Sequence, residues 1–502
     1  MTTERLHSTV LWALAGLTAL GVAVRFSSLG VQSYHHDEVI TAARVIPGEF
    51  EHMLRQVKGS ESNPPLYYVL AWGWAKAFGT GEIGLRSLSA LFGAATVPVV
   101  FLAGRELASR RAGLIAAAIV AVNPMLIWYS QEARSYAVLV FFGALALLFF
   151  VRALRTGRGR DLALWALASA LALCSHYFAV FAVAIEAAWL LVALRSQWRL
   201  ALPAVGAVVA VGLALLPLIS AQVNPTHIGW IDHSPLPTRL FETGASFLVG
   251  ETGHVIAEPP RERYALIPMA LIGVALLLVA LRGSPRERRG ALLGLGVGVG
   301  VVLLASGAAL AGKDYIAERN LLPALVPLAT AAALGFAASG ARRTGLACAA
   351  LLCAYWLAFD VYVTQTPNLQ RPDFRDLARQ LGPPRRPRAI VTWKLAADPI
   401  RFYLDGPSRR AYRGVLPVRE IDVVSKPVVA RKPPGLPPGF RPVERRRLER
   451  LTLIRYLSPR IQQVPFHVLR DARTGFGRNA VVADGPRAAP YKRPRAAPRR
   501  SR

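Results

Sequence analysis

Long apolar blocks recur along the chain and constrain its fold more than any other feature. Each block is about 17–22 residues long, enough for a helix to cross the roughly 30 Å hydrocarbon core of a membrane. With 53% hydrophobic residues among 502, the chain is too apolar for an ordinary soluble enzyme. We therefore predict an α-helical polytopic membrane protein. The candidate spans cover residues 8–26, 87–104, 112–129, 136–152, 161–175, 178–194, 200–219, 264–282, 290–311, 320–339 and 344–362.

Arginine clusters mark every second loop between these spans and predict the topology. By the positive-inside rule such loops are cytoplasmic. The 161–194 block is too long for one span and is divided at Ser175-His176-Tyr177. Residues 27–86 then form one outer loop, in which the aromatic-rich Pro64–Phe78 is predicted to lie on the membrane. About eleven transmembrane helices result, with the C-terminal region outside. The clusters are 105–111, 152–160, 195–199, 282–289 and 342–343.

The last part of the chain differs in composition from the predicted transmembrane catalytic domain, residues 1–362. PDFRDLARQL is typical of an amphipathic helix, and RAIVTW and LTLIRYL are typical of strands. We predict a small α/β extracytoplasmic domain over 363–484 and a disordered basic tail over 485–502. From Arg371 to the end, 32 Lys and Arg residues stand against 10 Asp and Glu residues. This excess either attracts anionic lipids or polymers, or reflects a genome that favours arginine.

Polar residues, most of them ionisable, gather in the predicted outer loops rather than in the middle of the spans. Such groups at the ends of several spans can converge on one cavity, and they are functional candidates for that reason. They are His35, His36, Asp37, Glu38 and His52 in the first loop, then Gln131, Glu132, Arg134, Tyr136, His176, Tyr177, His227, Asp232, His233, Glu242, Glu251, His254, Lys313, Asp314, Tyr315, Glu318 and Arg319.

The adjacent acids Asp37 and Glu38 are the most informative pair. A partly buried carboxylate can deprotonate a hydroxyl, while its neighbour holds a cation or orients a substrate. Neighbouring residues on a helix point about 100° apart, so the two carboxylates are expected to have different roles. The alternative is an ordinary acidic cap at the start of a helix.

The other candidates also have structural alternatives. Glu132 and Arg134 could form a plain interfacial ion pair, and His176 could satisfy a backbone carbonyl. Lys313 and Arg319 either anchor to lipid headgroups or clamp a phosphate.

The order of these features resembles the GT-C membrane glycosyltransferases of the family 39 type, which include protein O-mannosyltransferases and the lipid A aminoarabinose transferase. The resemblance runs over roughly residues 8–362. It is carried by His36-Asp37-Glu38, Asn63–Leu70, Leu85–Ala94, Asn123–Ala137, Ser175–Phe181 and Glu318–Leu328.

The resemblance implies an enzyme of the cytoplasmic membrane that takes a sugar, hexosyl or pentosyl, from a polyprenyl-phosphate donor on the outer face. It implies Asp37 as the catalytic base, with Glu38 and Glu132 as further acids of the catalytic set. Related enzymes often have Lys or His before the Pro-Pro dipeptide, where this chain has Asn63. The phosphate charge must then be balanced by arginine, lysine or a metal. The substrate-binding candidates are His36, Asn63, Tyr67, Arg134, Tyr136, His176, Tyr177, Lys313 and Arg319. If the enzyme uses a divalent metal ion, its candidate ligands are Asp37, Glu38, Glu132 and His176.

The chemistry that such an enzyme needs is compatible with these residues. A polyprenyl phosphate is already a good leaving group, so no nucleotide-binding motif is required, and none is found. A base near the acceptor hydroxyl and cations near the leaving phosphate suffice. The acceptor is a lipid, protein or polysaccharide, membrane lipids are further partners, and nucleic acid is not expected. The resemblance implies single-step displacement with inversion.

Two other functions stay open at this point. A transporter or flippase of polyprenyl-linked sugars should carry polar or helix-breaking residues near the middle of its spans, whereas the spans here are clean. A non-catalytic membrane protein could instead bind a cell-envelope polymer through its basic C-terminal domain, in which case Asp37 would be dispensable.

Overall fold

The computed structural model describes residues 3–223, 234–251, 262–404, 414–426, 436–471 and 479–484. The chain divides into two compact units. The helical unit comprises Met1–Gln32 and Ile40–Gln370, and the sheet unit comprises Ser33–Val39 and Arg371–Arg502. The first acidic motif therefore belongs to the sheet unit, although it lies early in the chain. His227, Asp232, His233, His254 and the predicted tail 485–502 lie outside the described residues.

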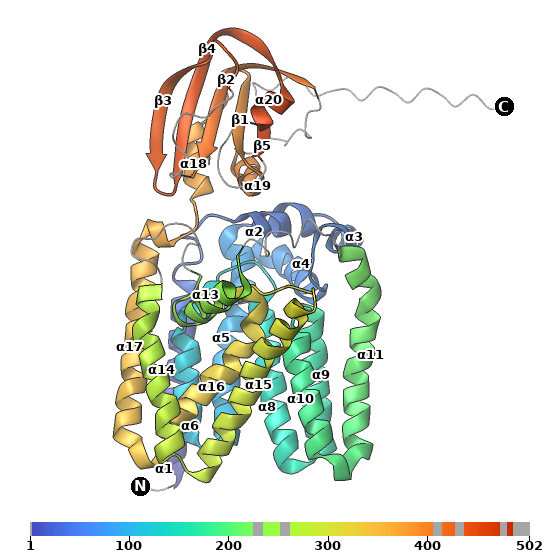
Figure 1. Ribbon diagram of the computed structural model, residues 1–502, viewed down its shortest axis with the longest axis vertical. Coiled ribbons are helices and arrows are strands. Elements are labelled where there is room, and N and C mark those ends of the chain that lie inside the picture. The colour runs from blue at the N-terminus through green and yellow to red at the C-terminus, as the bar shows by residue number, and fades with distance from the viewer. Residues whose placement is uncertain are drawn as a thin grey trace, which may run out of the picture. The chain divides into compact units, whose positions relative to one another are not determined.

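Long helices run side by side through the helical unit, with the short helices α3 and α4 toward the end opposite the N-terminus (Figure 1). The helices that contain the predicted spans are α1 (Thr3–Phe26), α5 (Glu82–Leu107), α6 (Arg110–Val122), α7 (Pro124–Ser130), α8 (Tyr136–Thr156), α9 (Gly159–Ser175), α10 (Ala179–Ala193), α11 (Trp198–Gln222), α14 (Glu262–Arg282), α15 (Pro285–Leu310), α16 (Leu325–Phe336) and α17 (Arg342–Gln365). The shorter elements are α3 (Phe50–Ser60), α4 (Leu66–Phe78), α13 (Leu236–Val249), the π-helix η1 (Thr41–Val45) and the 3₁₀-helix η4 (Glu318–Ala324).

Every predicted span falls on one of these helices or on a consecutive pair. Within the described ranges, eight helical segments are long and apolar enough to cross a membrane, or nine if the bent pair α6–α7 is one span. The two remaining predicted spans coincide with α9 and α10, which are shorter. The predicted break at His176 between them is confirmed, while the count of eleven spans stays a prediction.

Four of the five arginine clusters meet at one end of the bundle. Glu106 Oε2 accepts a bond of 2.6 Å from Arg155, and the Glu106 carbonyl accepts one from Arg286. Arg111 donates to the carbonyl oxygen of Arg342. Four of the five loops that the positive-inside rule assigned to one side therefore lie at the same end of the helical unit.

The bend between α6 and α7 begins the segment that carries Glu132 and Arg134. Asn123 caps α7 by accepting a hydrogen bond from Leu126 N, and Pro124 occupies the first turn, where its missing N–H costs nothing. The two helices meet at 57°. The chain then turns after Ser130 and starts α8 at Tyr136, which leaves residues 131–135 as a buried polar turn.

Small residues let neighbouring helices approach closely. A Cβ atom on Gly335 of α16 would lie 2.2 Å from the carbonyl oxygen of Ala275 in α14, so a larger residue there would force the two helices apart. Such small-residue contacts are typical of helix packing within membranes, where tight van der Waals contact replaces the hydrophobic effect.

The sheet unit is a five-stranded mixed sheet in the order β3-β4-β2-β1-β5. β1 and β2 are parallel, and the other neighbours are antiparallel. Apolar clusters cover both faces. The predicted helix PDFRDLARQL corresponds to α18, RAIVTW to β1 and LTLIRYL to part of β4. The elements are α2 (His36–Ile40), α18 (Phe374–Leu381), β1 (Arg388–Trp393), α19 (Lys394–Tyr403), β2 (Val415–Ser425), β3 (Arg441–Leu448), β4 (Leu451–Pro465), α20 (Phe466–Arg470) and β5 (Asn479–Asp484).

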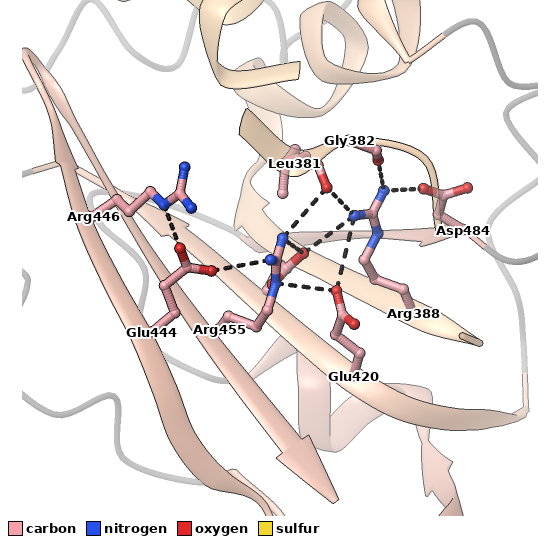
Figure 2. A network of polar contacts seen from close by, with 9 residues as sticks. Leu381, Gly382, Arg388, Glu420, Glu444, Arg446, Arg455 and Asp484 are labelled. Atoms are coloured by element: carbon pink, nitrogen blue, oxygen red, sulfur yellow. Dashed lines mark hydrogen bonds and ion pairs between the residues drawn. The ribbon is translucent and has the colours of Figure 1, made fainter. Parts of the chain in front are cut away.

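Two arginines within the sheet unit hold a network of carboxylates and carbonyls together (Figure 2). Arg388 donates to Asp484 at 2.5 Å and to the carbonyls that end α18. Arg455 pairs with Asp422 at 2.9 Å and with Glu444 at 3.0 Å. Asp422 is fully buried, and this burial raises its pKa to about 6 even though arginines surround it. The network joins all five strands and the end of α18.

Replacing Asp422 by Ala is expected to destabilise the sheet by about 2–3 kcal/mol. Removing one partner of a buried ion pair typically costs 3–5 kcal/mol, and the carboxylates that remain around Arg455 reduce this cost. Hydrogen exchange of the β2 and β4 amides measures the loss. The matched control is Asp471→Ala at an exposed ion pair, which should change little; equal exchange rates in both variants would show that the network is dispensable.

Candidate active site

Arg134 is the central cation of the buried polar turn between α7 and α8. Its side chain is 6% exposed, and Nη1 donates to Glu61 Oε2 at 2.7 Å and to Thr41 Oγ1 at 3.3 Å. Thr41 is the first residue of the π-helix η1, an irregularity that often occurs at functional sites. Residues from three separate parts of the chain therefore fix one guanidinium group.

Glu61 is the partner of Arg134 that sequence patterns did not indicate. It is 4% exposed and also accepts a hydrogen bond of 2.6 Å from the Tyr68 hydroxyl. Burial raises the pKa of Tyr68 well above its usual value. The charge of Arg134 lowers this pKa and the charge of Glu61 raises it, and the phenol stays protonated as a hydrogen-bond donor. Tyr67 packs edge-on against Tyr68 and is fully buried.

His176 lies in the turn between α9 and α10 and is buried beside two arginines. Its Nδ1 accepts a hydrogen bond from Phe178 N at 3.3 Å, so the neutral ring carries its proton on Nε2. Its ring contacts Tyr136, with centroids 5.6 Å apart. Burial, together with the charges of Arg134 and Arg319, lowers the pKa of His176 to about 3. The site therefore combines two cations with a neutral hydrogen-bond donor.

His176 is expected to make the protein less stable below neutral pH. Because its folded pKa of about 3 lies below the usual 6.5, the unfolded chain binds the extra proton. The contribution of His176 to the free energy of unfolding is fully present above about pH 6.5 and is lost as the pH falls toward 3. At pH 5 the loss is roughly 2 kcal/mol. Between pH 7 and pH 5, the melting temperature of His176→Gln should fall less than that of the wild type. The control His52→Gln should show the same fall as the wild type. A fall in His176→Gln as large as in the wild type would contradict the assignment.

An acidic side of the site surrounds Tyr129. Its hydroxyl donates to Glu251 Oε2 at 2.9 Å, and the charges of Glu132 and Glu318 also act on it. Glu132 is buried. In the part of the chain that the structure describes, no three His, Cys, Asp or Glu side chains are grouped as metal ligands.

The end of α11 links Tyr177 with the first loop. Gln222 Oε1 accepts a hydrogen bond of 2.6 Å from the Tyr177 hydroxyl. Its Nε2 donates to the carbonyl oxygens of Val57 and Asn63, at 2.8 and 3.1 Å. The two predicted site residues Asn63 and Tyr177 are therefore held through a glutamine that was not among the candidates.

An ion pair fixes the loop before Arg319. Arg239 of α13 donates to both oxygens of Asp314, and these bonds lower the pKa of Asp314. The ring of Tyr315 packs against Phe178, two residues after His176. Arg319 thereby comes close enough to act on His176, whereas the side chain of Lys313 is exposed.

The first acidic motif forms the start of α2 in the sheet unit. Glu38 is fully buried, and its Oε2 accepts from His35 N at 3.1 Å and from Arg371 Nη1 at 3.3 Å. The alternative of an acidic helix cap therefore describes Glu38 well. Asp37 is half-buried. His36 Nδ1 lies 3.3 Å from Asp398 Oδ2 of α19.

A large apolar cavity lies among α13, α14, α16 and α17. It has a volume of about 450 Å³ and almost no polar lining. Phe241, Leu248, Met269, Leu325 and Trp356 contribute to its walls. A cavity of this composition suits a hydrocarbon chain.

The chain is similar to known proteins both in part of its sequence and in its fold. The sequence model of the family described as "Dolichyl-phosphate-mannose-protein mannosyltransferase" matches residues 62–220, from just before α4 into α11. A search of curated proteins finds no match. Among solved structures, ArnT from Cupriavidus metallidurans in the apo state is 14% identical, with a TM-score of 0.58, and the match covers 89% of this chain and 98% of that one. The chain has the GT-C fold.

The structure of the same ArnT bound to undecaprenyl phosphate gives a similar match. It has a TM-score of 0.56 and 15% identity over 88% of this chain and 97% of that chain. The predicted fold class, a GT-C-like helical membrane protein with a small C-terminal α/β domain, is confirmed, and so is the resemblance on which it was based.

Proposed function

We propose that this GT-C protein is a membrane glycosyltransferase that moves a sugar from a polyprenyl-phosphate donor to an acceptor hydroxyl on the outer face of the cytoplasmic membrane. Glycosyl transfer is supported by the family match over residues 62–220 and by the fold shared with ArnT. The donor is supported by the ArnT structure that contains undecaprenyl phosphate. The transferred group is a hexosyl or pentosyl residue.

The observation that carries the proposal is that buried Arg134 and half-buried Arg319 both lie close enough for their charges to act on the neutral, buried His176. Both guanidinium charges would attract a bound phosphate, which would share Arg134 with the Glu61 carboxylate. Guanidinium groups also match phosphate oxygens in geometry, and the neutral imidazole adds a donor without adding charge. The cluster thus has the composition of a site for the leaving phosphate.

Leaving-group stabilisation and proton removal are the two contributions that the residues make. As the bond between the sugar and the phosphate breaks, negative charge grows on the phosphate, and preorganised cations stabilise it. Asp37 accepts the proton of the acceptor hydroxyl as it attacks the anomeric carbon. Glu38 positions α2 through its bonds to His35 and Arg371. Glu132 stays in the catalytic set as an orienting acid.

The prenyl chain of the donor is proposed to occupy the apolar cavity among α13, α14, α16 and α17. The walls of the cavity are apolar, so a hydrocarbon chain is more stable there than in water. Helix α13 lines this cavity and also supplies Arg239, which holds the loop leading to Arg319. The same helix therefore serves both the tail and the head of the donor.

Binding of undecaprenyl phosphate tests the proposal directly. Arg319→Gln is expected to weaken binding by about 10–100-fold, because it removes a charged donor to the phosphate. Native mass spectrometry of the purified protein with added undecaprenyl phosphate gives the ratio. The matched control is Arg55→Gln, which removes an exposed arginine paired with Glu51 and should bind normally. Wild-type protein that retains no undecaprenyl phosphate would refute the proposed donor.

A further inference from the structure

A second pocket lies where the ends of α1, α7 and α17 meet in the helical unit. Its volume is about 200 Å³, and it is more polar than the cavity for a hydrocarbon chain. Hydroxyl, amide and carboxylate groups stand beside one half-buried tryptophan ring. The residues that matter below are Ser27, Ser28, Trp128, Gln131, Asp360 and Gln365.

Asp360 is the unusual residue in this wall. Its Oδ2 atom is buried and has no hydrogen-bond partner among the residues that the structure describes. Buried polar atoms of native proteins nearly always have a partner, so an exception that lines a pocket indicates a ligand. An acid within a helix long and apolar enough to span a membrane is also a functional candidate by default.

Arg25 decides which kind of ligand fits. This buried arginine donates to the carbonyls of Val120 and Ala121 and to Ser130 Oγ, and its charge acts on Asp360. Arg25 already places one positive charge beside Asp360, so an added cation would bring a second positive charge into a buried place. A neutral hydroxyl can satisfy Oδ2 without changing the charge.

The size and lining of the pocket further limit which ligands can bind. A single water needs about 10–15 Å³ of such space, so this pocket holds on the order of a dozen non-hydrogen atoms, as in one hexose. An aromatic wall with a few fixed polar groups is the usual form of a small-molecule site. Gln131 Nε2 donates to Ser28 Oγ at 2.6 Å, which leaves the serine hydroxyl free to donate to a ligand.

We propose that this pocket binds one sugar ring, with a ring hydroxyl donating to Asp360 Oδ2 and Trp128 forming one wall. Binding of the ring does not depend on transfer. The assignment of this ring to the acceptor does rest on the proposed function: Gln131 lines the pocket and Glu132, the next residue, belongs to the candidate active site. The acceptor is then a carbohydrate rather than a serine or threonine of a protein.

Saturation-transfer NMR on the full-length protein in lipid nanodiscs tests the proposal, with methyl mannopyranoside and methyl glucopyranoside as probes at millimolar concentration. Nanodiscs avoid detergents with sugar headgroups. The wild type is expected to bind at least one probe, and Asp360→Asn is expected to weaken that binding at least 10-fold. Ser27→Phe, which fills the pocket but keeps Asp360 and Arg25, should abolish it. Asp161→Asn, an equal change in the first turn of α9, should bind like the wild type.

Each outcome decides the proposal. Loss of binding in Ser27→Phe supports it even if Asp360→Asn fails to fold. The proposal would be overturned if the wild type gave no signal or if both pocket variants bound the probe normally. Displacement of the probe by ethanolamine would also overturn it, because that result indicates a cation site. Arg319→Gln should bind the probe normally, so failure of the proposed transferase and failure of this pocket are separate results.

Discussion

Replacing Asp37 by Asn is expected to reduce glycosyl transfer by about 10²–10⁴-fold, the usual contribution of a general base. Asparagine has nearly the same shape but cannot take the proton of the acceptor hydroxyl. Glu38 cannot substitute for it, because Glu38 is buried and its Oε2 is bonded to His35 N and Arg371. Turnover in proteoliposomes supplied with a polyprenyl-phosphate sugar measures the effect.

The control for Asp37→Asn is Asp471→Asn, which changes an exposed carboxylate of the same sheet unit and should leave turnover unchanged. Undecaprenyl phosphate should still bind to Asp37→Asn, because the base does not hold the phosphate. Normal turnover by Asp37→Asn would remove the proposed base and favour a non-catalytic membrane protein.

Arg134→Met is expected to lower the free energy of unfolding by about 3–5 kcal/mol and to abolish transfer. The variant leaves Glu61 buried without its cation, and an uncompensated buried charge is costly. Adding Glu61→Gln should restore most of the stability, because Tyr68 can still donate to the new amide oxygen. Transfer should stay abolished in the double variant, because the leaving phosphate lacks its cation. Thermal unfolding and turnover of the same samples separate the two effects.

The control for this pair is Arg55→Met, which breaks the exposed pair with Glu51 and should change stability by less than about 1 kcal/mol. A double variant that recovers transfer together with stability would mean that Arg134 only holds Glu61 in place. The phosphate site would then have to be built on Arg319 without Arg134.

The apolar patterns predicted the regular elements well, because each is coded locally. Residues 388–393 were predicted as a strand and form β1, and the chain breaks at His176 where the long apolar block was divided. β3 was not predicted, because its sequence RPVERRRL lacks the apolar alternation of a half-buried strand. It pairs with β4 as an edge strand whose side chains are mostly exposed.

The pairings across the site could not be read from one sequence. Glu61 lies 73 residues before Arg134 in a polar stretch that resembles an ordinary loop, and only the fold brings the two together. The same holds for Gln222, which reaches the first loop 159 residues earlier. A buried carboxylate that pairs with a residue far away in the sequence leaves no local signal. By contrast, His176 and Arg319 were chosen for their places at helix ends, and those places do bring them close together.

If α9 and α10 cross the membrane as predicted, their lengths would affect the surrounding lipid. With 17 and 15 residues they extend only about 25 and 23 Å, less than the roughly 30 Å of hydrocarbon in a typical bilayer. Short helices that cross a membrane make the adjacent leaflets thin or draw their headgroups inward. A dimple in the lipid beside the turn that bears His176 would lower a phosphate headgroup to the level of the arginines, so that the donor could enter sideways from the leaflet without first rising into water.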